Sequence, residues 1–398
     1  MPWLETDVHD QRIQFVLAAR RRTAKLTELC QAFGISRKTG YKWLGRERAA
    51  HSVAVLADQS RRPHRSPWRT PPDVVTRVVA LREQYGWGGE KLAWLLEREG
   101  VSITGRTIDR IIAREGLTRA NVAHAPAPSR FERPAPNDLW QMDAKGAYPL
   151  RPSGRCHPLS VIDDHSRFAV GLFALPVLAA APVRGALIQC FERYGVPTAM
   201  LMDHGSPWWA SASRDGLTTL SVFLLKQGIR LIYGAVRHPQ TQGKVERFHR
   251  TLGERLRWHG VPTTLGDFER RFVAFRHEYN ANRPHSAIGM RPPRMRFVVS
   301  ARSYRPSPAE WEYPAEWPLR TVQRHGTIWL DNRRYFVSEA LRGETVACRP
   351  FAHRILVTYR HMYVRELHLR TQRSIPLLQP TDGEWPAALE GAAGCVKV

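Results

Sequence analysis

Apolar residues recur at helical spacing in the first part of the chain, between residues 10 and 48. They fall into three runs, so we expect three short helices. Gly34 and Ile35 provide a turn, and the Ser36 hydroxyl is a suitable N-cap for the last helix. That helix carries the cations Arg37, Lys38, Lys42 and Arg46. This pattern predicts a helix-turn-helix whose last helix enters the DNA major groove. A three-helix module that binds protein is the alternative.

The same pattern repeats after a basic, proline-rich stretch. Helices are expected over residues 72–85, 90–99 and 104–115. Arg106 and Arg110 lie four positions apart, so they share one face near the start of the third helix. We therefore predict two tandem helix-turn-helix domains, residues 1–60 and 61–120, followed by a basic linker over 121–135.

From residue 136 onward the chain changes to short apolar runs that alternate with longer amphipathic ones. Strands are expected over 139–144, 159–164, 168–175, 199–203 and 230–233. Helices are expected over 177–194, 217–227, 242–258 and 268–280. Three strands followed by alternating helices and strands indicate an α/β domain, a mixed sheet covered by helices, over residues 136–290.

The last part of the chain has strand character. A proline-rich stretch over 291–320 is expected to be a linker, and the residues after it alternate between apolar and polar. Strands are expected over 321–330, 334–337, 345–349, 354–359 and 361–369. We expect these strands to form a small β-barrel over residues 321–372. The tail, 373–398, shows little pattern and is expected to be poorly ordered.

Charge narrows the class of partner. The chain has 60 Lys and Arg against 36 Asp and Glu, a net charge of +24. Such an excess favours a polyanion, because each phosphate that a cation neutralises releases a counterion. Membrane surfaces also attract cations, but the longest apolar stretch, 169–183, is too short to span a bilayer and is broken by Pro176 and Pro182. Nucleic acid is therefore the favoured partner.

The first residues and the cysteines indicate a compartment. Acids stand near the start of the chain, where a signal peptide requires cations, so we expect a cytoplasmic protein. The cysteines are odd in number, scattered, and include no Cys-x-x-Cys pair. They are expected to be packing residues rather than disulfide partners or zinc ligands: Cys30, Cys156, Cys190, Cys348 and Cys395.

Three acids stand where catalytic carboxylates are expected. Asp143 and Asp203 each follow an apolar strand, and Glu246 lies on the long basic helix. Three hard oxygen ligands suit Mg²⁺ or Mn²⁺. Such a site serves in-line displacement at phosphorus, with two ions about 3.5 to 4 Å apart. Taken singly, either aspartate could cap a turn, and Glu246 could be a solvated helix residue.

The sequence around these acids is more specific than the acids alone. The motifs WQMDA, VIDDHSRF, LMDHGSPW and HPQTQGKVERFHRTL resemble the catalytic core shared by retroviral integrases and bacterial insertion-sequence transposases. The chain most resembles the insertion-sequence transposases with an amino-terminal helix-turn-helix pair, from the first helix-turn-helix to YNANRPHSAI. By this resemblance Asp143, Asp203 and Glu246 are the three metal-binding acids of a ribonuclease-H-like fold.

The resemblance also implies an activity. A transposase of this family binds transposon end repeats, cleaves to expose 3′ hydroxyls and joins them to target DNA with two Mg²⁺ or Mn²⁺ ions. Joining two ends requires two active sites held together, so we expect a homo-oligomer on double-stranded DNA. A catalytically silent DNA-binding regulator or assembly subunit with the same fold is the alternative from another class. A nuclease that cuts without joining would use the same site.

This chain departs from its relatives after the second acid. His204 replaces the usual Asn, and the interval to Glu246 is longer, with the extra residues expected in a surface insertion, WWASASRDGLTT. His204 is expected to contact a phosphate or to orient Asp203. Asp163 and Asp164 are expected to be supporting residues, one of them paired with Arg167. Three histidines are expected to cap, pack or touch phosphate: His165, His238 and His249.

The long helix also carries cations beside its acid. Arg250 lies four residues after Glu246, on the same face, and Lys244 and Arg247 flank that acid. These cations are expected to hold a DNA end beside the metals, although a merely solvated basic face is the alternative. The apolar side of the helix should anchor it: Val245, Phe248 and Leu252.

Overall fold

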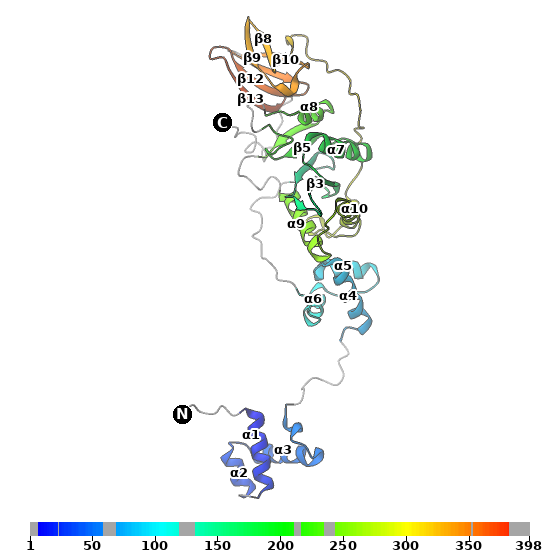
Figure 1. The fold of residues 1–398 in the computed structure, drawn as a ribbon. Helices are drawn as coiled ribbons and strands as arrows, with labels where there is room; N and C mark the ends of the chain where they lie inside the picture. The colour runs from blue at the N-terminus through cyan, green and yellow to red at the C-terminus, as the bar shows by residue number, and fades with distance from the viewer. Residues whose placement is uncertain are drawn as a thin grey trace. The chain divides into compact units, whose positions relative to one another are not determined.

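The structure, a computed structural model, describes residues 7–22, 24–58, 69–118, 132–210, 216–234, 243–351 and 353–381. The chain divides into two compact units, Met1–Pro71 and Pro72–Val398 (Figure 1). No helix in the described ranges is both long and apolar enough to cross a membrane.

The first unit contains the three expected helices. They are α1 (Val8–Arg20), α2 (Leu26–Ala32) and α3 (Arg37–Ala50), followed by a 3-10 turn, η1 (Val53–Leu56). Ser36 Oγ accepts a hydrogen bond from Thr39 N at 3.2 Å, which confirms the predicted N-cap of α3. Phe15, Cys30 and Trp43 are buried between the helices. The apolar spacing therefore predicted both the helices and the side chains that hold them together.

A second group of three helices opens the second unit. These are α4 (Pro72–Tyr85), α5 (Gly89–Arg98) and α6 (Gly105–Arg114), close to the predicted bounds. Thr104 caps α6 by accepting a hydrogen bond from Thr107 N at 3.3 Å. Leu92, Leu96 and Ile108 are completely buried and form the centre of the group.

The central sheet is mixed, as expected. Its strands are β1 (Leu139–Ala144), β2 (Tyr148–Pro149), β3 (Arg155–Asp163), β4 (Ala169–Leu175), β5 (Ala199–Met202) and β6 (Arg230–Tyr233). The path β4-β3-β1-β5-β6 runs across it, with β3 antiparallel to β1 and β4. β1, β5 and β6 are parallel to one another. The end of β1 that contains Asp143 therefore lies beside the end of β5 that precedes Asp203.

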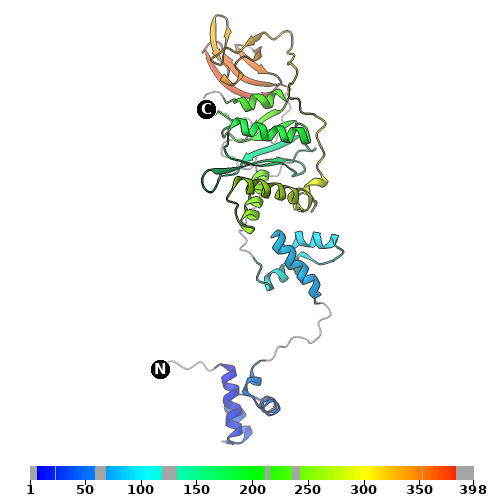
Figure 2. The same cartoon turned by 45° about the vertical axis from the view of Figure 1, so that its right-hand side comes forward.

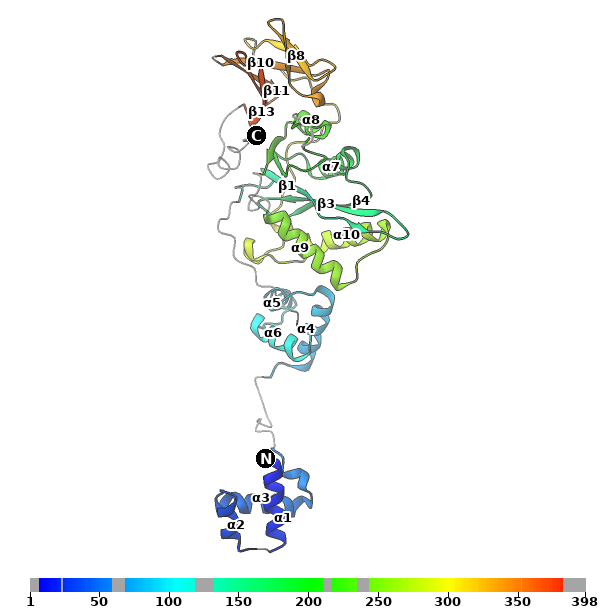
Figure 3. The same ribbon diagram turned by 60° about the vertical axis from the view of Figure 1, so that its left-hand side comes forward.

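Helices cover both faces of this sheet (Figures 2 and 3). On one face lie α7 (Ala180–Tyr194) and α8 (Thr219–Lys226), and on the other lie α9 (Gly243–Trp258) and α10 (Leu265–Ala281). Val170 of β4 belongs to the hydrophobic core on the side of α7 and α8, whereas Ala169 and Leu172 belong to the core on the side of α9 and α10. Val170 and Leu172 lie on opposite sides although they are two positions apart, because a register shift between Val161 and Ile162 leaves Val170 as an extra residue in β4. Val245 and Phe248 of α9 belong to the same core as Ala169 and Leu172.

The carboxy-terminal strands pack against the α8 side of the core. A five-stranded antiparallel sheet has the order β13-β12-β11-β10-β7, and β8 pairs with β9. The bounds are β7 (Leu319–Thr321), β8 (Thr327–Leu330), β9 (Arg333–Phe336), β10 (Thr345–Phe351), β11 (Arg354–Tyr359), β12 (Met362–His368) and β13 (Arg373–Pro380). A pairing that closes these strands into the expected barrel is not shown among the described residues.

Two expectations for this region were wrong. The single strand expected over 321–330 is two, because the chain turns between β7 and β8 at Gly326, which has a φ of 68°. The stretch expected to be a poorly ordered tail begins with β13, which pairs along β12. Its main chain bonds to the exposed edge of β12, so its order comes from that partner rather than from its own side-chain pattern. Pro376 is tolerated because β13 is itself an edge strand.

The stretch expected to be a linker before these strands also packs onto the core. Phe297 stacks on Phe168 with ring centroids 4.1 Å apart, and Asn137 Nδ2 donates to Val298 O at 2.7 Å. The described cysteines are buried and free, as expected of packing residues: Cys30, Cys156, Cys190 and Cys348. Cys395 lies outside the described residues.

Candidate active site

Asp143 lies near the end of β1, partly covered by neighbouring side chains. Burial, and next the charge of Asp203, raise the pKa of Asp143 to about 6, with a further contribution from Glu246 included in that value. The three acids singled out from the sequence therefore act on one another electrostatically. His249 Nδ1 lies 3.6 Å from Asp143 Oδ2.

Asp203 follows β5 directly, at the start of a turn. Two donors fix its carboxylate, since Gly205 N donates to Oδ1 at 2.9 Å and Trp208 Nε1 donates to the same oxygen at 2.5 Å. Trp208 is only 1 % exposed, so the stretch expected to be a surface insertion begins inside the protein. Residues 211–215 of that stretch lie outside the described residues.

His204 packs in a group of aromatic rings beside Asp203. Its ring packs edge-on against Trp209 at 4.6 Å between centroids and lies 5.7 Å from Tyr233. Burial in this aromatic group lowers the pKa of His204, while Asp203 opposes the shift. The groups that orient Asp203 in the described structure are Gly205 and Trp208, and sequence reasoning missed the tryptophan because its position was assigned to the surface.

Glu246 lies in the first turn of α9 and is exposed. The positive end of the helix dipole favours a carboxylate at this position. The opposite side of the helix is anchored as predicted, with Val245, Phe248 and Leu252 at most 1 % exposed. Val245 N also donates to Gln141 Oε1 at 3.4 Å. Gln141 thus connects the start of α9 to the strand that carries Asp143.

Gln141 also bonds to Asp164, one of the two buried acids that were expected to be supporting residues. Its Nε2 donates to Asp164 Oδ1 at 2.8 Å, and Lys244 of α9 pairs with the same oxygen. Asp163 accepts hydrogen bonds from Asn137 N and from both the main chain and the hydroxyl of Ser166. Both acids therefore hold the ends of strands and of α9 in place, consistent with a supporting role.

The pair expected between one of these acids and Arg167 is not formed. Arg167 Nη2 pairs with Glu132 at 2.6 Å, and its Nη1 donates to the main-chain oxygens of Asp164 and His165. Asp164 pairs with Lys244 instead, because the buried carboxylate lies beside the start of α9. Lys244 is thereby engaged inside the protein rather than on an open basic face.

His249 lies beside Asp143, one of the candidate carboxylates. Besides its approach to Asp143, its Nε2 lies 2.9 Å from Ser160 Oγ on β3. Burial, and next the nearby charge of Lys145, lower the pKa of His249 to about 4. A neutral imidazole is thus held against Asp143. His165 contacts Arg133 O and Arg296, and His238 lies outside the described residues.

The chemistry of the three carboxylates suits a hard divalent cation. Asp143, Asp203 and Glu246 offer only oxygen, and positive charge between them would relieve the repulsion that raises the pKa of Asp143. In the described ranges no three His, Cys, Asp or Glu side chains stand close enough to hold a metal ion as they are placed.

The predicted DNA-contacting cations lie on several surfaces. Arg37, Lys38, Lys42, Arg106, Arg110, Arg247 and Arg250 are exposed, and Arg46 is partly exposed. Lys42 and Arg46 both lie 4.9 Å from the centre of the Trp43 ring. Arg247, Arg250 and Arg257 of α9 line one hollow of about 1020 Å³.

Family models match most of these parts. An integrase core domain model matches residues 133–239, which include Asp143 and Asp203, and a second integrase core domain model matches residues 227–293, which include Glu246. A helix-turn-helix domain model matches residues 11–64, and a homeodomain-like domain model matches residues 39–112.

Several known proteins are similar to this chain. The insertion element IS407 uncharacterized 31.7 kDa protein of Burkholderia multivorans is 26 % identical over 253 residues, 61 % of this chain and 88 % of that protein. The insertion element IS476 uncharacterized 39.2 kDa protein of Xanthomonas euvesicatoria is 27 % identical over 256 residues, 62 % of this chain and 71 % of that protein. The Gag-Pol polyprotein of baboon endogenous virus is 24 % identical over 201 residues, 48 % of this chain and 11 % of the polyprotein.

Solved structures with a similar chain include two of viral integrases. The HTLV-2 integrase catalytic core domain in complex with magnesium gives a TM-score of 0.31 at 14 % identity, covering 41 % of this chain and 97 % of that one. The simian T-cell lymphotropic virus intasome in complex with PP2A regulatory subunit B56 gamma gives a TM-score of 0.36 at 13 % identity, covering 69 % and 93 %.

The integrase core domain models match the part of the chain that forms the mixed sheet and α9. The order β4-β3-β1-β5-β6, with the antiparallel β3 beside β1, coincides with the integrase core match and gives an integrase-like ribonuclease-H fold. The resemblance expected from the sequence is therefore confirmed: the chain carries an integrase core domain behind helix-turn-helix domains, and it is similar to proteins of bacterial insertion elements.

Proposed function

We propose that the chain is a DNA transposase that binds the end repeats of a transposon, cleaves there to expose 3′ hydroxyls, and joins them to target DNA. The observation that carries the proposal is the pair of integrase core matches, over residues 133–239 and 227–293, which include Asp143, Asp203 and Glu246. A net charge of +24 and the helix-turn-helix matches support DNA as the substrate.

Asp143, Asp203 and Glu246 would hold two Mg²⁺ or Mn²⁺ ions. When bound, such ions activate the attacking oxygen and stabilise the charge on the leaving oxygen of an in-line displacement. The chain's own residues position these carboxylates. Gly205 and Trp208 orient Asp203, and Gln141 ties the start of α9 to β1 so that Glu246 stays near Asp143.

Two displacements at phosphorus make up the reaction. Water attacks the phosphodiester at the transposon end, and the bond to the 3′ oxygen breaks, which leaves a free 3′ hydroxyl. That hydroxyl then attacks a target phosphodiester, and a second 3′ oxygen leaves. Arg247 and Arg250, exposed on α9 beside Glu246, would hold the DNA end through its phosphates.

The remaining parts would bind DNA and assemble the complex. Residues 1–60 and 61–120 would read the end repeats through α3 and α6, joined by the linker over 121–135 to the catalytic core over 136–290. The carboxy-terminal strands, β7 to β13, would contact DNA or a second subunit. Because both transposon ends must be joined, the active form would be a homo-oligomer on nucleoid DNA.

The test uses the purified chain, duplexes that carry the repeats flanking its gene, Mg²⁺ and a plasmid target. Wild type should cleave and join. Asp203→Asn should lower both rates by about a thousandfold or more, since a metal ligand is lost, while repeat binding stays near wild type. Trp140→Phe, which changes a buried residue of β1, is the matched control and should retain activity.

Other outcomes would select the alternatives. Binding of the repeats by wild type without cleavage or joining would indicate a silent regulator or assembly subunit. Cleavage without joining would indicate a nuclease. Full activity of Asp203→Asn would show that the site is elsewhere.

A further inference from the structure

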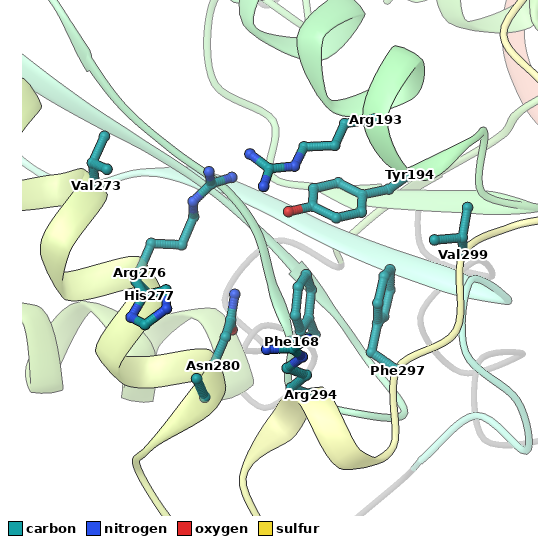
Figure 4. A pocket seen from close by; sticks show the side chains of 11 residues that line it. Phe168, Arg193, Tyr194, Val273, Arg276, His277, Asn280, Arg294, Phe297 and Val299 are labelled. Carbon is teal, nitrogen blue, oxygen red and sulfur yellow. The ribbon is translucent and has the colours of Figure 1, made fainter.

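A separate hollow in the described part of the chain has an unusual combination of charge and aromatic rings. It lies between the end of α7 and one face of α10 and has a volume of about 530 Å³ (Figure 4). Arg193, Arg276 and Arg294 line it, and the guanidinium groups of the first two approach one another across it. Aromatic rings form the wall between these cations: Phe168, Tyr194 and Phe297. None of the three candidate metal-binding acids belongs to this hollow.

The three arginines of this hollow make no ion pair with a described residue. Arg276 Nη1 donates to Val170 O at 2.9 Å, and Arg193 lies 5.3 Å from the centre of the Tyr194 ring. No ion pair joins either of them, or Arg294, to an acid of the described ranges. Glu132 pairs with Arg167 and Arg296, and Glu269 lines an adjoining hollow with Arg193 and Arg276 without an ion pair to either. The hollow therefore presents unpaired positive charge to whatever enters it.

Exposed apolar side chains surround the same opening. Val273 and Val299 line the hollow and are 62 % and 57 % exposed. Met295 and Val298, on the segment that forms its edge, are 62 % and 67 % exposed. Grouped apolar side chains at this exposure are typical of a surface that a partner covers. The partner should thus offer both acids and apolar rings.

One segment of this chain has that composition. Residues 307–317, SPAEWEYPAEW, contain no Lys or Arg in a chain of net charge +24. Glu310, Glu312 and Glu316 are exposed, and no cation of a described residue pairs with them. Trp311 stands between two of them and is 41 % exposed. Glutamates that flank an indole match a hollow of arginines with aromatic walls.

The segment cannot enter the hollow of its own chain. After Val299 the chain is fastened along the core, where Arg302 Nη1 donates to Pro197 O at 2.5 Å and Gln227 Nε2 donates to Arg305 O at 2.9 Å. Arg360 Nη2 then holds Ala309 O at 3.1 Å, so the segment lies against the carboxy-terminal sheet, beyond α8 (Figure 1). Tyr313 is tied to the same sheet through Thr345 O.

We propose that residues 307–317 of one copy of this chain dock in the hollow lined by Arg193, Arg276 and Arg294 of a second copy. Trp311 enters against the aromatic wall, and Glu310 and Glu312 meet the guanidinium groups. Because the segment and the hollow are different surfaces, a two-fold pair forms this contact twice. The contact gives the dimer without using the catalytic carboxylates, so it stands or falls independently of the reaction.

The test is a charge exchange in the full-length chain, followed by sedimentation velocity. Glu310→Lys/Glu312→Lys and Arg276→Glu/Arg294→Glu should each raise the dimer dissociation constant by about tenfold or more, because each places like charges together. An equimolar mixture of the two variants should restore the dimer, since every contact then joins opposite charges again. Arg270→Glu/Arg271→Glu, on α10 but outside the hollow, is the matched control and should behave as wild type.

A peptide of residues 306–318 with a fluorophore tests the same contact directly. It should bind the Glu310→Lys/Glu312→Lys chain, whose hollows are vacant, and lose binding when Arg276→Glu/Arg294→Glu is added. Thermal unfolding checks that every variant is folded. Unchanged dimerisation in the arginine variant, or no restoration on mixing, overturns the proposal. Loss of duplex DNA binding with unchanged dimerisation also overturns it and identifies DNA as the occupant.

Discussion

Two donors orient the Asp203 carboxylate. The shorter of the two hydrogen bonds comes from Trp208, whose Nε1 lies 2.5 Å from Oδ1. Outer groups of this kind set the direction and basicity of a metal ligand. Trp208→Phe keeps a buried ring and removes the donor. We expect it to weaken Mn²⁺ binding by about 10- to 100-fold, as measured by titration calorimetry.

Trp140→Phe provides the comparison for this prediction. Trp140 is also buried, and its Nε1 bonds to Asn137 Oδ1 at 3.0 Å rather than to a carboxylate of the site. Both variants lose an indole donor inside the core, so a general loss of stability should affect them alike. Equal Mn²⁺ affinity in the two variants would show that Trp208 does not position Asp203.

A second residue-level prediction concerns acid stability. Burial, and next the charge of Arg283, lower the pKa of His285 to about 2. The unfolded chain takes up a proton there below about pH 6.5, whereas the folded chain does not, so folding free energy is lost as the pH falls. From pH 6.5 to 5 the loss from this residue is about 2 kcal/mol. His285 Nε2 is buried without a hydrogen-bond partner in the described structure, which agrees with a neutral ring.

His285→Phe should remove this part of the acid sensitivity. The measurement is urea unfolding of both chains between pH 8 and pH 5. Wild type should lose more stability than the variant over that range, by about 2 kcal/mol. His249, with its pKa lowered to about 4 by burial, should keep part of the slope in both. Parallel curves would contradict the assignment.

At the scale of elements, α5 and α6 approach each other through glycines. A Cβ built on Gly89 would lie 2.1 Å from Gly105 O and 2.7 Å from Asp109 Oδ1. The backbone oxygen cannot move without shifting α6. Gly89→Ala should therefore destabilise α4–α6 by more than about 2 kcal/mol, which hydrogen exchange of amides in residues 72–114 would reveal.

Gly45→Ala is the opposite case among helical glycines. Gly45 lies inside α3, and a Cβ there would meet no atom within 4 Å. Alanine should stabilise that helix by about 0.5 to 1 kcal/mol, because glycine loses more backbone entropy on folding. If Gly89→Ala were equally harmless, the close packing of α5 on α6 would not matter for stability.

Elements with a strong period of their own were predictable from the sequence. The bounds of α4, β1, β6 and β11 match the predicted ranges, because each buries a regular set of its own side chains. β13 was missed because its order depends on the β12 edge, which no local pattern reports. The acids of the candidate site were found through motifs. The Lys244–Asp164 pair was not, since it joins residues that only the folded chain brings together.

Sequence reasoning missed two residues near the candidate site, Gln141 and Trp208, and only Gln141 had a signal in the sequence. Gln141 precedes Asp143 by two positions, so the period of a strand already placed both on one side of β1. That spacing could have identified it. Trp208 had no such signal, because its role depends on a turn that brings the indole back to Asp203 after the strand has ended.

At the scale of the whole molecule, the positive charge is divided between two units, each with a predicted DNA-reading helix. Arg37, Lys38, Lys42 and Arg46 belong to the first unit, and Arg106 and Arg110 belong to the second. If these cations neutralise phosphates, each contributes about 0.9 to the slope of log affinity against log salt. Replacing the four by alanine should lower the slope by about 3 to 4, and replacing the two should lower it by about 2.

Measuring the slope in the combined variant decides whether the two units bind DNA together. Contacts made at the same time by separate units release their counterions independently, so the two reductions should add to about 5. Fluorescence anisotropy of a repeat duplex across a series of salt concentrations gives each slope. A combined reduction no larger than that of the four-residue variant would mean that only the first unit contacts DNA. Cleavage at saturating protein should persist in every case, because none of these cations lies in the core that carries Asp143.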